Sequence, residues 1–559
     1  MDLRLLAAEP LPAERDAIDA VVGAAETNGH RVARADRDRR DLLLPALRAA
    51  QRRVGWVSEG ALGYASRRLD VPPADAYGVA TFYALLSLEE RPPEVLHVCT
   101  DLSCRLAGVE VPEGAHASPC LGLCERAPAS LRTIAGDEPR EIQLPERGPS
   151  LPQHGEQGLR LLRRIGIADP ASLDSYLAHG GYGALRRAIE LGPEQVVRQV
   201  TESRLLGRGG AAFPTGVKWE AVAKQAARPH FLVCNADESE PGTFKDRVLM
   251  EGDPFALVEA MTIAAYATGC EHGFLYVRAE YPLAHERLEN ALAQARARGF
   301  LGRDVLGSGF SFDVELRIGA GAYVCGEETA LFQSIEGYRG EPRNKPPFPV
   351  EVGLFRKPTV VNNVETLFNV LEIVDQGGGA FAATGTEGST GTRLFCVSGH
   401  VAKPGLYEVP FGTTLRELLD LAQASPPKAV LLGGAAGAFV RPDQLDLPLT
   451  FEDTRAAGVT LGSGVVIVYD ESADLVDAVL RIAEFFRDES CGQCVPCRVG
   501  TVRQEEALQR LAAGRGRDDE FATLADLAQV MRDASICGLG QTAANAVASA
   551  IENLGVFSP

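Results

Sequence analysis

Eight of the twelve cysteines in this 559-residue chain fall into tight groups, and their spacing limits how the chain can fold more than any other feature does. In one group Cys491, Cys494 and Cys497 follow one another at intervals of three residues, and a fourth thiol lies further along, at Cys537. The other group comprises two pairs nearer the start of the chain, Cys99 with Cys104 and Cys120 with Cys124. Where thiols stay reduced, loops with such spacing are typical of metal centres.

The later group has the composition of a [4Fe–4S] ligand set. Three thiolates, with two residues between each and the next, can surround one side of a cluster. Cys537 in the segment ICGLG can complete the four ligands. Structural zinc also takes four thiolates, but its cysteines usually form two separated C-x2-C pairs. We therefore favour an iron–sulfur cluster here, with zinc as the alternative.

The earlier group consists of a C-x4-C pair, Cys99 and Cys104, and a C-x3-C pair, Cys120 and Cys124. Two pairs on two loops suit a [2Fe–2S] cluster, since each iron then takes one pair. A zinc site, or four packed thiols that bind no metal, would have the same spacing. The spacing alone leaves these alternatives open.

Charge and hydropathy exclude several classes of function. The net charge is −19, which disfavours nucleic acid and anionic membranes as main partners. A hydrophobic share of 45% with 23% charged residues is typical of globular domains. We find no run of about 18 apolar residues that could span a bilayer. The first residues show no secretory signal, so we expect a cytoplasmic location without membrane insertion.

Hydrophobic periodicity divides the chain into an α/β multidomain protein. Apolar residues three and four apart predict helices after residue 40, and strands alternate with helices from about 200 to 380, which is typical of a parallel sheet. A small α+β unit and a mostly helical segment follow. We expect a mobile or loosely docked lead segment over 1–40, a helical and cysteine-bearing domain over 41–150, a helical linker over 151–200, an α/β domain over 201–385, a small α+β domain over 386–471 and a helical domain over 472–559.

Glycine-rich segments within the α/β domain predict a ligand site. LLGRGGAAFPTGVKW places Gly207, Gly209 and Gly210 ahead of Lys218, and glycines let a backbone approach a phosphate closely. The pattern lacks a clear preceding strand, so it does not support a dinucleotide-binding Rossmann turn. A purely structural turn is the alternative interpretation.

Acidic and amide side chains accompany these glycines. Carboxylates cannot hold a phosphate, but they can accept hydrogen bonds from sugar hydroxyls, so glycine loops and acids together fit a ribityl phosphate or a dinucleotide. For the acidic turn, a solvated surface loop is the alternative. The side chains concerned are Asn235, Asp237, Glu238, Glu240, Glu327 and Glu328, with Gly326, Lys345, Phe348, Asn362 and Asn363 nearby.

Together these segments resemble the flavin-containing, NADH-oxidising subunit of respiratory complex I and its soluble relatives. GRGGAAFPTGVKW, CNADESEPGTFKD, GAGAYVCGEETA, NKPPFP, KPTVVNNVETL and ESCGQCVPCRVGT occur in the order typical of that family. Residues 40–130 resemble its partner subunit, a thioredoxin-like [2Fe–2S] protein, fused in front through LLPALRAAQRRVGW, YGVATFYALL, CTDLSC and PCLGLC. The stretch between Cys104 and Cys120 is shorter than usual, so we expect a reduced thioredoxin-like domain that lacks a helix.

The resemblance implies FMN, NAD(H), one [4Fe–4S] and one [2Fe–2S] cluster as cofactors, and a small domain of the ubiquitin-like, soluble-ligand-binding type. The cofactors would carry hydride transfer, so no side chain is expected to act as a catalytic acid or base. By resemblance the flavin side comprises Gly207, Gly209, Gly210, Lys218, Asn235, Asp237, Glu238, Tyr323, Gly326, Glu327, Asn362 and Asn363. The NAD(H) side comprises Phe213, Glu240, Glu328, Lys345 and Phe348.

Fusion of these two subunits is typical of NAD-dependent formate dehydrogenases and NAD-reducing hydrogenases. PPFPVEVGLFRKPT and MRDASICGLGQTAANAV resemble the molybdenum- or tungsten-dependent formate dehydrogenase type most. We therefore expect a partner subunit with a Mo/W-pterin centre and further clusters, which would deliver electrons from formate to NAD+. The alternatives are a hydrogenase module, the NADH-input module of complex I, or, in another class, a non-catalytic metal-bound scaffold.

Overall fold

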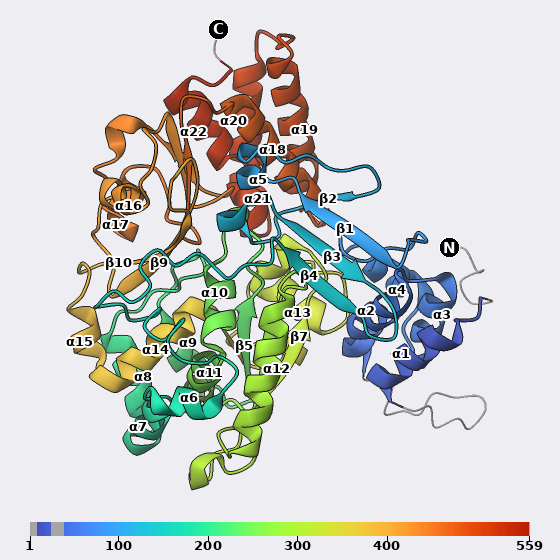
Figure 1. The fold of residues 1–559 in the computed structure, drawn as a ribbon, viewed down its shortest axis with the longest axis vertical. Coiled ribbons are helices and arrows are strands. Elements are labelled where there is room, and N and C mark those ends of the chain that lie inside the picture. The colour runs from blue at the N-terminus through green and yellow to red at the C-terminus, as the bar shows by residue number, and fades with distance from the viewer. Residues whose placement is uncertain (1–7, 24–38, 558–559) are drawn as a thin grey trace.

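The computed structural model describes residues 8–23 and 39–557. A small helical unit lies at one side of the molecule and is followed by a four-stranded sheet that reaches the main body (Figure 1). Its helices are α1 (Pro12–Val22), a 3-10 turn (Arg40–Leu42), α2 (Leu43–Val54), α3 (Glu59–Arg68) and α4 (Pro73–Ala80). Among the described residues, no helix combines the length and apolar character needed to cross a membrane.

The expectation of a loosely docked lead segment is wrong for helix α1. Ile18 and Val22 are four residues apart, so they share one helix face, and both are buried in the core that α2 and α3 also line. The Tyr64 hydroxyl of α3 donates to the Asp19 carboxylate at 2.9 Å. An amphipathic face and a polar contact therefore hold α1 in place, while residues 1–7 and 24–38 of that expected segment lie outside the described residues.

The first sheet carries the earlier cysteine pairs and has the strand order β2-β1-β3-β4. β1 pairs in parallel with β2 and antiparallel with β3, which pairs antiparallel with β4. Between Cys104 and Cys120 the chain forms only the end of a one-turn helix and a three-residue strand, as the shortened spacing predicts. The elements are β1 (Glu94–Cys99), α5 (Leu102–Leu106), β2 (His116–Ser118), a 3-10 turn (Cys124–Arg126), β3 (Ser130–Ile134) and β4 (Arg140–Leu144).

The large domain is built on a parallel sheet of order β7-β6-β5-β8. Sequence periodicity predicts three of these strands, β5 (Phe231–Ala236), β6 (His272–Val277) and β7 (Asp313–Ile318), but not β8 (Thr359–Asn363). The helices are α6 (Leu173–Ala178), α7 (Gly183–Leu191), α8 (Pro193–Glu202), α9 (Thr215–Ala223), α10 (Lys245–Gly252), α11 (Pro254–Thr268), α12 (Pro282–Ala297), α13 (Glu328–Ile335), α14 (Val364–Gln376) and α15 (Gly378–Ala382), with 3-10 turns at Val305–Gly307, Tyr323–Gly326 and Leu354–Arg356.

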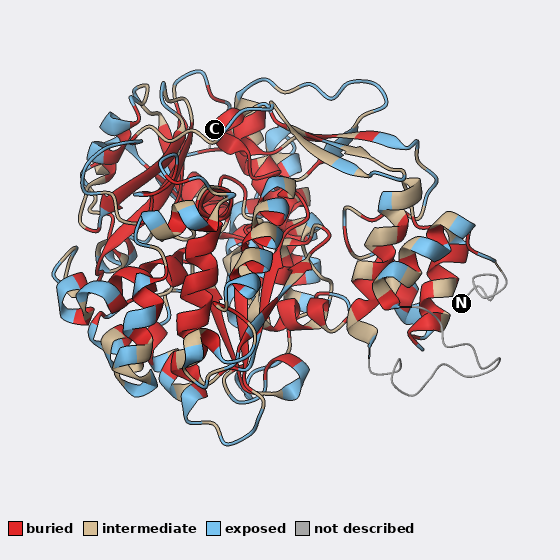
Figure 2. Cartoon of the chain, turned by 60° about the horizontal axis from the view of Figure 1, so that its bottom comes forward, coloured by how far each residue is buried: buried red, intermediate tan, exposed pale blue. Residues whose placement is uncertain are grey.

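This parallel sheet separates two hydrophobic cores, because successive strand residues point to opposite faces. Val233 of β5 packs in the core shared with the first helical unit and the C-terminal helices. Leu232 and Cys234 pack in the other core, with α11, α12 and α14. Figure 2 shows buried residues concentrated in this body and exposed residues on its outer helix faces.

Two smaller units complete the chain. The expected small α+β unit is a five-stranded sheet of order β10-β9-β13-β11-β12 with its own core. Its elements are β9 (Thr392–Gly399), β10 (Gly405–Pro410), α16 (Leu415–Leu421), β11 (Ala429–Leu432), β12 (Ala438–Val440), a 3-10 turn (Pro442–Gln444), α17 (Phe451–Ala456) and β13 (Val465–Tyr469). The helical unit comprises α18 (Leu475–Asp488), α19 (Val495–Ala512), α20 (Glu520–Ala534), α21 (Gly538–Thr542) and α22 (Asn545–Leu554).

Candidate functional site

The glycine loop lies against the carboxyl ends of two neighbouring parallel strands. Asn235 lies near the end of β5, and its register partner Asn363 ends β8. Open α/β sheets place ligands at this edge, because the loops that leave the strands there leave a crevice between them. Asn235 Nδ2 donates to the Gly326 carbonyl at 2.8 Å, so three separate segments of the sequence meet at one point.

The glycines of the 205–219 segment form a tight turn that leads into α9. The Gly207 N–H donates to the Phe213 carbonyl at 3.0 Å, and Gly210 adopts φ +114°, a conformation that favours glycine. A Cβ on Gly209 would lie 3.1 Å from Asn363 Cβ. Arg208 is buried and anchors the turn through Nη2 to the Thr390 carbonyl at 2.6 Å. The turn is therefore a close-fitting cradle of exposed and half-buried glycine backbone.

Lys218 lies between the glycine turn and the loop after β7. Its Nζ is 2.5 Å from Glu328 Oε1 and donates to the Val361 carbonyl at 3.0 Å. The adjacent Trp219 is buried, and its indole N–H donates to Asn362 Oδ1 at 2.8 Å. Asn362 therefore serves to position α9, while the Lys218 ammonium is half-buried beside the glycines, where a phosphate would need it.

The acidic turn after β5 is not a solvated loop. Asp237 and Glu238 are both buried, and burial raises the pKa of Glu238 to about 8. The Glu238 carboxylate accepts the backbone N–H groups of Asp246 at 2.8 Å and Arg247 at 3.0 Å, which begin α10. Glu238 thus holds the turn and α10 together, and its contact with flavin remains a prediction.

Glu240 connects the turn to the small domain, a connection that sequence reasoning missed. Its carboxylate accepts the Ala436 N–H at 2.8 Å and the Tyr323 hydroxyl at 3.3 Å. A Cβ on Gly434 would lie only 2.7 Å from Glu240 Cγ. The glycine-rich run GGAAGA after β11 was the available signal. Burial raises the pKa of Glu240 to about 7.

Glu489 is a second residue that sequence reasoning missed. It lies two positions before Cys491, and its carboxylate accepts the Tyr323 N–H at 2.8 Å. Burial raises the pKa of Glu489 to about 7. Tyr323 therefore contacts both Glu240 and Glu489, so the loop expected to hold flavin is in contact with the segment that leads into the later cysteine run.

The residues expected on the NAD(H) side form the open part of the site. The Phe213 and Phe348 side chains are 51% and 53% exposed, so their rings are available for stacking. Lys345 Nζ lies 2.6 Å from Glu327 Oε1, and Glu327 caps α13 by accepting the Thr329 and Ala330 N–H groups at 2.9 Å. Exposed aromatic side chains, together with the glycine turn, Lys218 and the acids, are residue types that fit a planar ring with a polyol phosphate.

The later cysteines lie on the segments that lead into α19 and α21. Cys494 is the residue before this helix and Cys497 lies in its first turn, while Cys537 directly precedes α21. Cys497 is buried and the other three are half-buried. Burial raises the pKa of Cys497 to about 12 and that of Cys537 to about 11, so a bound metal would have to displace the protons of these thiols.

The earlier cysteines, Cys99, Cys104, Cys120 and Cys124, are all buried, and the fold brings the two pairs together. The Sγ atoms of Cys120 and Cys124 are 3.4 Å apart. Hydrogen bonds with the Cys104 and Cys120 thiols raise the pKa of Cys99 well above its usual range. Within residues 8–23 and 39–557, no three His, Cys, Asp or Glu side chains are grouped as one metal ion would require.

Four family models match this chain. They are described as Nuo51 FMN-binding domain (residues 200–372), NADH-ubiquinone oxidoreductase-F iron-sulfur binding region (477–555), thioredoxin-like [2Fe-2S] ferredoxin (30–112) and SLBB domain (394–422). The NADH-quinone oxidoreductase F 2 protein of Rhizobium meliloti (strain 1021) is 46% identical over 399 residues, which are 70% of this chain and 95% of that protein. The chain belongs to the NADH-quinone oxidoreductase-F family.

Hydrogenase subunits are also similar to this member of the oxidoreductase-F family. NADP-reducing hydrogenase subunit HndC of Solidesulfovibrio fructosivorans is 45% identical over 395 residues, 70% of this chain and 80% of HndC. A chain of a solved NAD+-reducing [NiFe]-hydrogenase in the air-oxidised state has a TM-score of 0.78 and 32% identity, covering 92% of this chain and 93% of that one. This chain is therefore a diaphorase-type oxidoreductase subunit with FMN-binding, [4Fe–4S] and [2Fe–2S] domains.

The match to the thioredoxin-like [2Fe-2S] family covers Cys99 and Cys104 but stops before Cys120. Assignment of the individual cysteines as ligands, and of the individual flavin and NAD(H) contacts, therefore remains our prediction. The match to the iron-sulfur binding region includes all four later cysteines.

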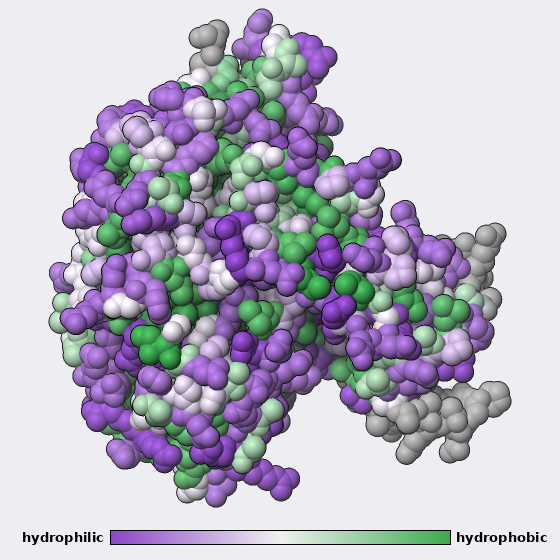
Figure 3. Space-filling model, viewed as in Figure 1, coloured by the Kyte–Doolittle hydropathy of each residue, from purple (hydrophilic) through white to green (hydrophobic). Residues whose placement is uncertain are grey.

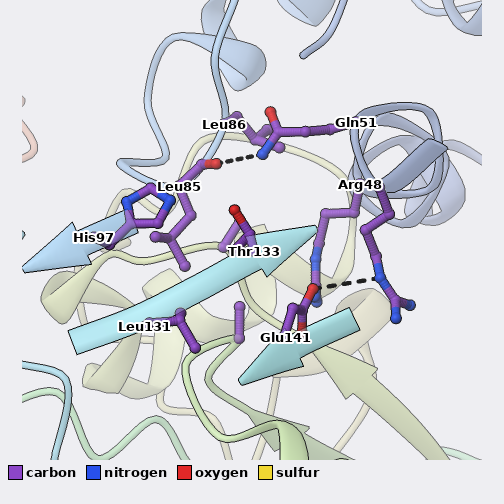
Figure 4. A pocket seen from close by; sticks show the side chains of 11 residues that line it. Arg48, Gln51, Leu85, Leu86, His97, Leu131, Thr133 and Glu141 are labelled. Atoms are coloured by element: carbon purple, nitrogen blue, oxygen red, sulfur yellow. Dashed lines mark hydrogen bonds and ion pairs between the residues drawn. The ribbon is translucent and has the colours of Figure 1, made fainter. Parts of the chain in front are cut away.

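Two cavities lie away from the glycine turn. One, of about 50 Å³, lies where the first helical unit, the first sheet and the large domain meet, and its lining includes Arg48, His97 and Glu141 (Figure 4). The other, of about 560 Å³, is lined by Arg126, Arg147 and Lys403 among others. Neither cavity is lined by a residue predicted for the flavin or NAD(H) side. The face seen in Figure 3 is mostly hydrophilic, in keeping with the high charge.

Proposed function

We propose that this subunit exchanges electrons between NAD(H) and a partner subunit that oxidises formate at a Mo/W-pterin centre. The position of Tyr323 supports the proposal that electrons pass between the NAD(H) side and the cluster. Its hydroxyl donates to Glu240 on the NAD(H) side at 3.3 Å, and its N–H donates to Glu489 beside the cysteine run at 2.8 Å. One residue thus spans the distance between the dinucleotide side and the cluster loop.

FMN supplies, when bound, the conversion between hydride transfer and single-electron transfer. The protein's own residues bind and orient. The glycine turn and Lys218 would hold the phosphate, and Asn235 and Asn363 would face the polyol and ring. Phe213 and Phe348 would stack against the dinucleotide and exclude water from one side of the site. No side chain needs to act as a general base.

The formate assignment rests on two sequence segments, PPFPVEVGLFRKPT and MRDASICGLGQTAANAV, that resemble the formate dehydrogenase type. A hydrogenase partner is the second candidate. It is favoured by the likeness to the NAD+-reducing [NiFe]-hydrogenase chain, which spans 92% of this chain and so includes the fused N-terminal part. Relatives such as the Rhizobium protein align with only 70% of it.

The deciding experiment is anaerobic NADH formation by the complex co-purified from its native host. We expect NADH to form from NAD+ with formate as the only electron donor. NADH formation with hydrogen alone would replace formate by the second candidate. If the complex reduces a dye with NADH but forms NADH with neither formate nor hydrogen, the diaphorase activity would stand and quinone would be the next electron partner to test.

A further inference from the structure

A buried cluster of charged residues joins the flavin turn to the loop that carries Cys120, outside the site described above. Arg278 directly follows β6 and is 2% exposed. Its Nη1 donates to the Glu238 carbonyl at 2.7 Å, and its Nη2 donates to the Cys120 carbonyl at 2.6 Å. One guanidinium thus contacts the main chain of a predicted cluster ligand and that of the turn at the flavin site.

Neighbouring contacts fix the cysteine loop in this position. Arg247 is fully buried, and its Nε donates to the Gly122 carbonyl at 2.9 Å. Gly122 has φ +65°, and a Cβ there would lie 2.2 Å from the Tyr281 hydroxyl oxygen, so only glycine fits. The loop therefore cannot move away from Arg278 without breaking several buried contacts.

The two buried arginines differ in how far their charge is compensated. Arg247 pairs with two acids, Glu125 at 2.5 Å and Glu251 at 2.9 Å. Arg278 pairs with one acid, Glu280, at 2.7 Å, and its Nε has no hydrogen-bond partner among the described residues. Charges act strongly where water is excluded, so the charge of Arg278 remains effective at the nearby cysteine loop.

A fixed positive charge favours the reduced state of a cluster. Reduction of a [2Fe–2S] cluster held by these cysteines would add one electron, which NADH would supply by way of flavin, and it would break no bond. The site becomes more negative by one charge, and net charge and hydrogen bonding are among the factors that set cluster potentials. A positive charge at Arg278 should therefore raise the reduction potential of the [2Fe–2S] cluster, which can be measured.

We propose that Arg278 is a positioning residue that raises the reduction potential of the [2Fe–2S] cluster and holds the cluster loop against the flavin turn. The proposal rests on ligation of that cluster by Cys99, Cys104, Cys120 and Cys124. Glu280 opposes the effect, since its carboxylate partly neutralises the guanidinium. Arg278 and Glu280 therefore have opposite effects on the reduction potential of the cluster.

The test is a potentiometric titration of the purified, cluster-loaded protein, followed by EPR of the reduced [2Fe–2S] signal. Arg278→Gln is expected to shift the reduction equilibrium at least tenfold toward the oxidised form, which is about 59 mV lower for one electron. Glu280→Gln is expected to shift it in the opposite direction, and the double variant is expected to lie between the two single variants. Arg278→Lys, which keeps the charge, is expected to retain most of the wild-type potential.

Two internal controls separate charge from general damage. The [4Fe–4S] potential in the same samples should stay unchanged. Arg164→Gln removes another buried arginine with one acidic partner, Asp253 at 2.7 Å, and should not move the [2Fe–2S] potential. If Arg278→Gln fails to load the cluster, the Glu280→Gln result decides: an upward shift supports the proposal and an unchanged potential overturns it.

Equal potentials in wild type, Arg278→Gln and Glu280→Gln would overturn the proposal. Its premise is tested separately by Cys120→Ser, which should remove the [2Fe–2S] signal. A signal that persists in Cys120→Ser would refute the ligand assignment and with it the proposal, while NADH-driven dye reduction would remain as evidence for the diaphorase.

Discussion

The two cysteine groups lie in contrasting surroundings. The later group lies on a loop and helix start with three of its four thiols half-buried, and three of its cysteines belong to one short segment, 491–497. The earlier group is fully buried, and its second pair is held by arginines that come from the large domain. The later site is therefore specified mainly by local sequence, whereas the earlier one depends on contacts between distant segments.

The largest effect is expected from removing a ligand of the locally specified site. Cys537→Ser should abolish the [4Fe–4S] EPR signal and block electron transfer beyond FMN, because the cluster would lose one of its four predicted thiolate ligands. NADH-driven reduction of a dye that accepts electrons from flavin should persist. An intact reduced-cluster spectrum would remove Cys537 from the ligand set.

The next effect concerns the region that depends on distant contacts. Arg247→Gln leaves the buried Glu251 without its arginine partner and Glu125 with Arg126 alone, and breaking a buried pair in this way costs about 3–5 kcal/mol. We expect hydrogen exchange of residues 120–126 to accelerate accordingly. As the matched change at the other site, Arg487→Gln breaks a partly exposed pair with Glu505 and should cost about 0.2–1 kcal/mol. Equal losses of hydrogen-exchange protection in Arg247→Gln and Arg487→Gln would show that the two cysteine groups do not differ in this way.

Glu240, which contacts Tyr323 and the small domain, gives a pH-dependent prediction. Its pKa of about 7 means that the carboxyl ionises as pH rises through 7, and the ionised form repels the dinucleotide phosphates. The KM for NADH should therefore rise between pH 6 and 8. Glu240→Gln should flatten this profile and lower the rate of dye reduction severalfold while FMN stays bound, because its amide nitrogen cannot accept the Tyr323 hydrogen bond. Unchanged NADH kinetics would count against the assignment.

The same carboxyl should make stability depend on pH. An acid whose pKa is raised in the folded state holds its proton longer than it does in the unfolded chain. The contribution of Glu240 to the free energy of unfolding should therefore fall as pH rises from about 4.5, its ordinary value, to about 7, and level off above that. Comparing wild type with Glu240→Gln by thermal melts across this range isolates that contribution.

The smallest effect is expected from a single weak contact at the later cysteines. The Ser490 hydroxyl lies 3.2 Å from Cys497 Sγ. Hydrogen bonds to cluster thiolates raise the reduction potential, so Ser490→Ala should lower that of the [4Fe–4S] cluster slightly and leave the [2Fe–2S] potential unchanged. A shift in the [2Fe–2S] potential instead would mean that the two sites are not independent.

Much of the fold could be predicted from local pattern. The strands β5, β6 and β7 are apolar runs between turn signals, and α11 is apolar on nearly all sides because it is buried on nearly all sides. β8 was missed because its residues VVNN run straight into α14, so no turn signal separates strand from helix. The helix at Pro12–Val22 was missed because many charged residues surround its short apolar face.

At the candidate site, the sequence was enough to predict the residues expected to bind the cofactors, but not all of the residues that contact them. The glycines and Lys218 could be predicted as a phosphate site because a glycine-rich segment followed by a lysine suits a phosphate whatever the surrounding fold. Glu489, Gly434 and Ala436 were not predicted, since each acts through a contact with a segment more than a hundred residues away. The run GGAAGA marks Gly434 and Ala436 as part of a glycine-rich turn, but it does not show which distant segment they contact.

The sequence by itself determined the later cysteine run, the glycine turn, the order of the domains and the family, because these depend on residue types at short spacing. Only the tertiary structure decided that Cys99 of the first earlier pair lies against Cys120 of the second, that Glu238 holds α10, and that Arg278 lies between Cys120 and the flavin turn. The physical reason is that buried charges and thiols are paired by packing, and packing joins residues without regard to their separation along the chain.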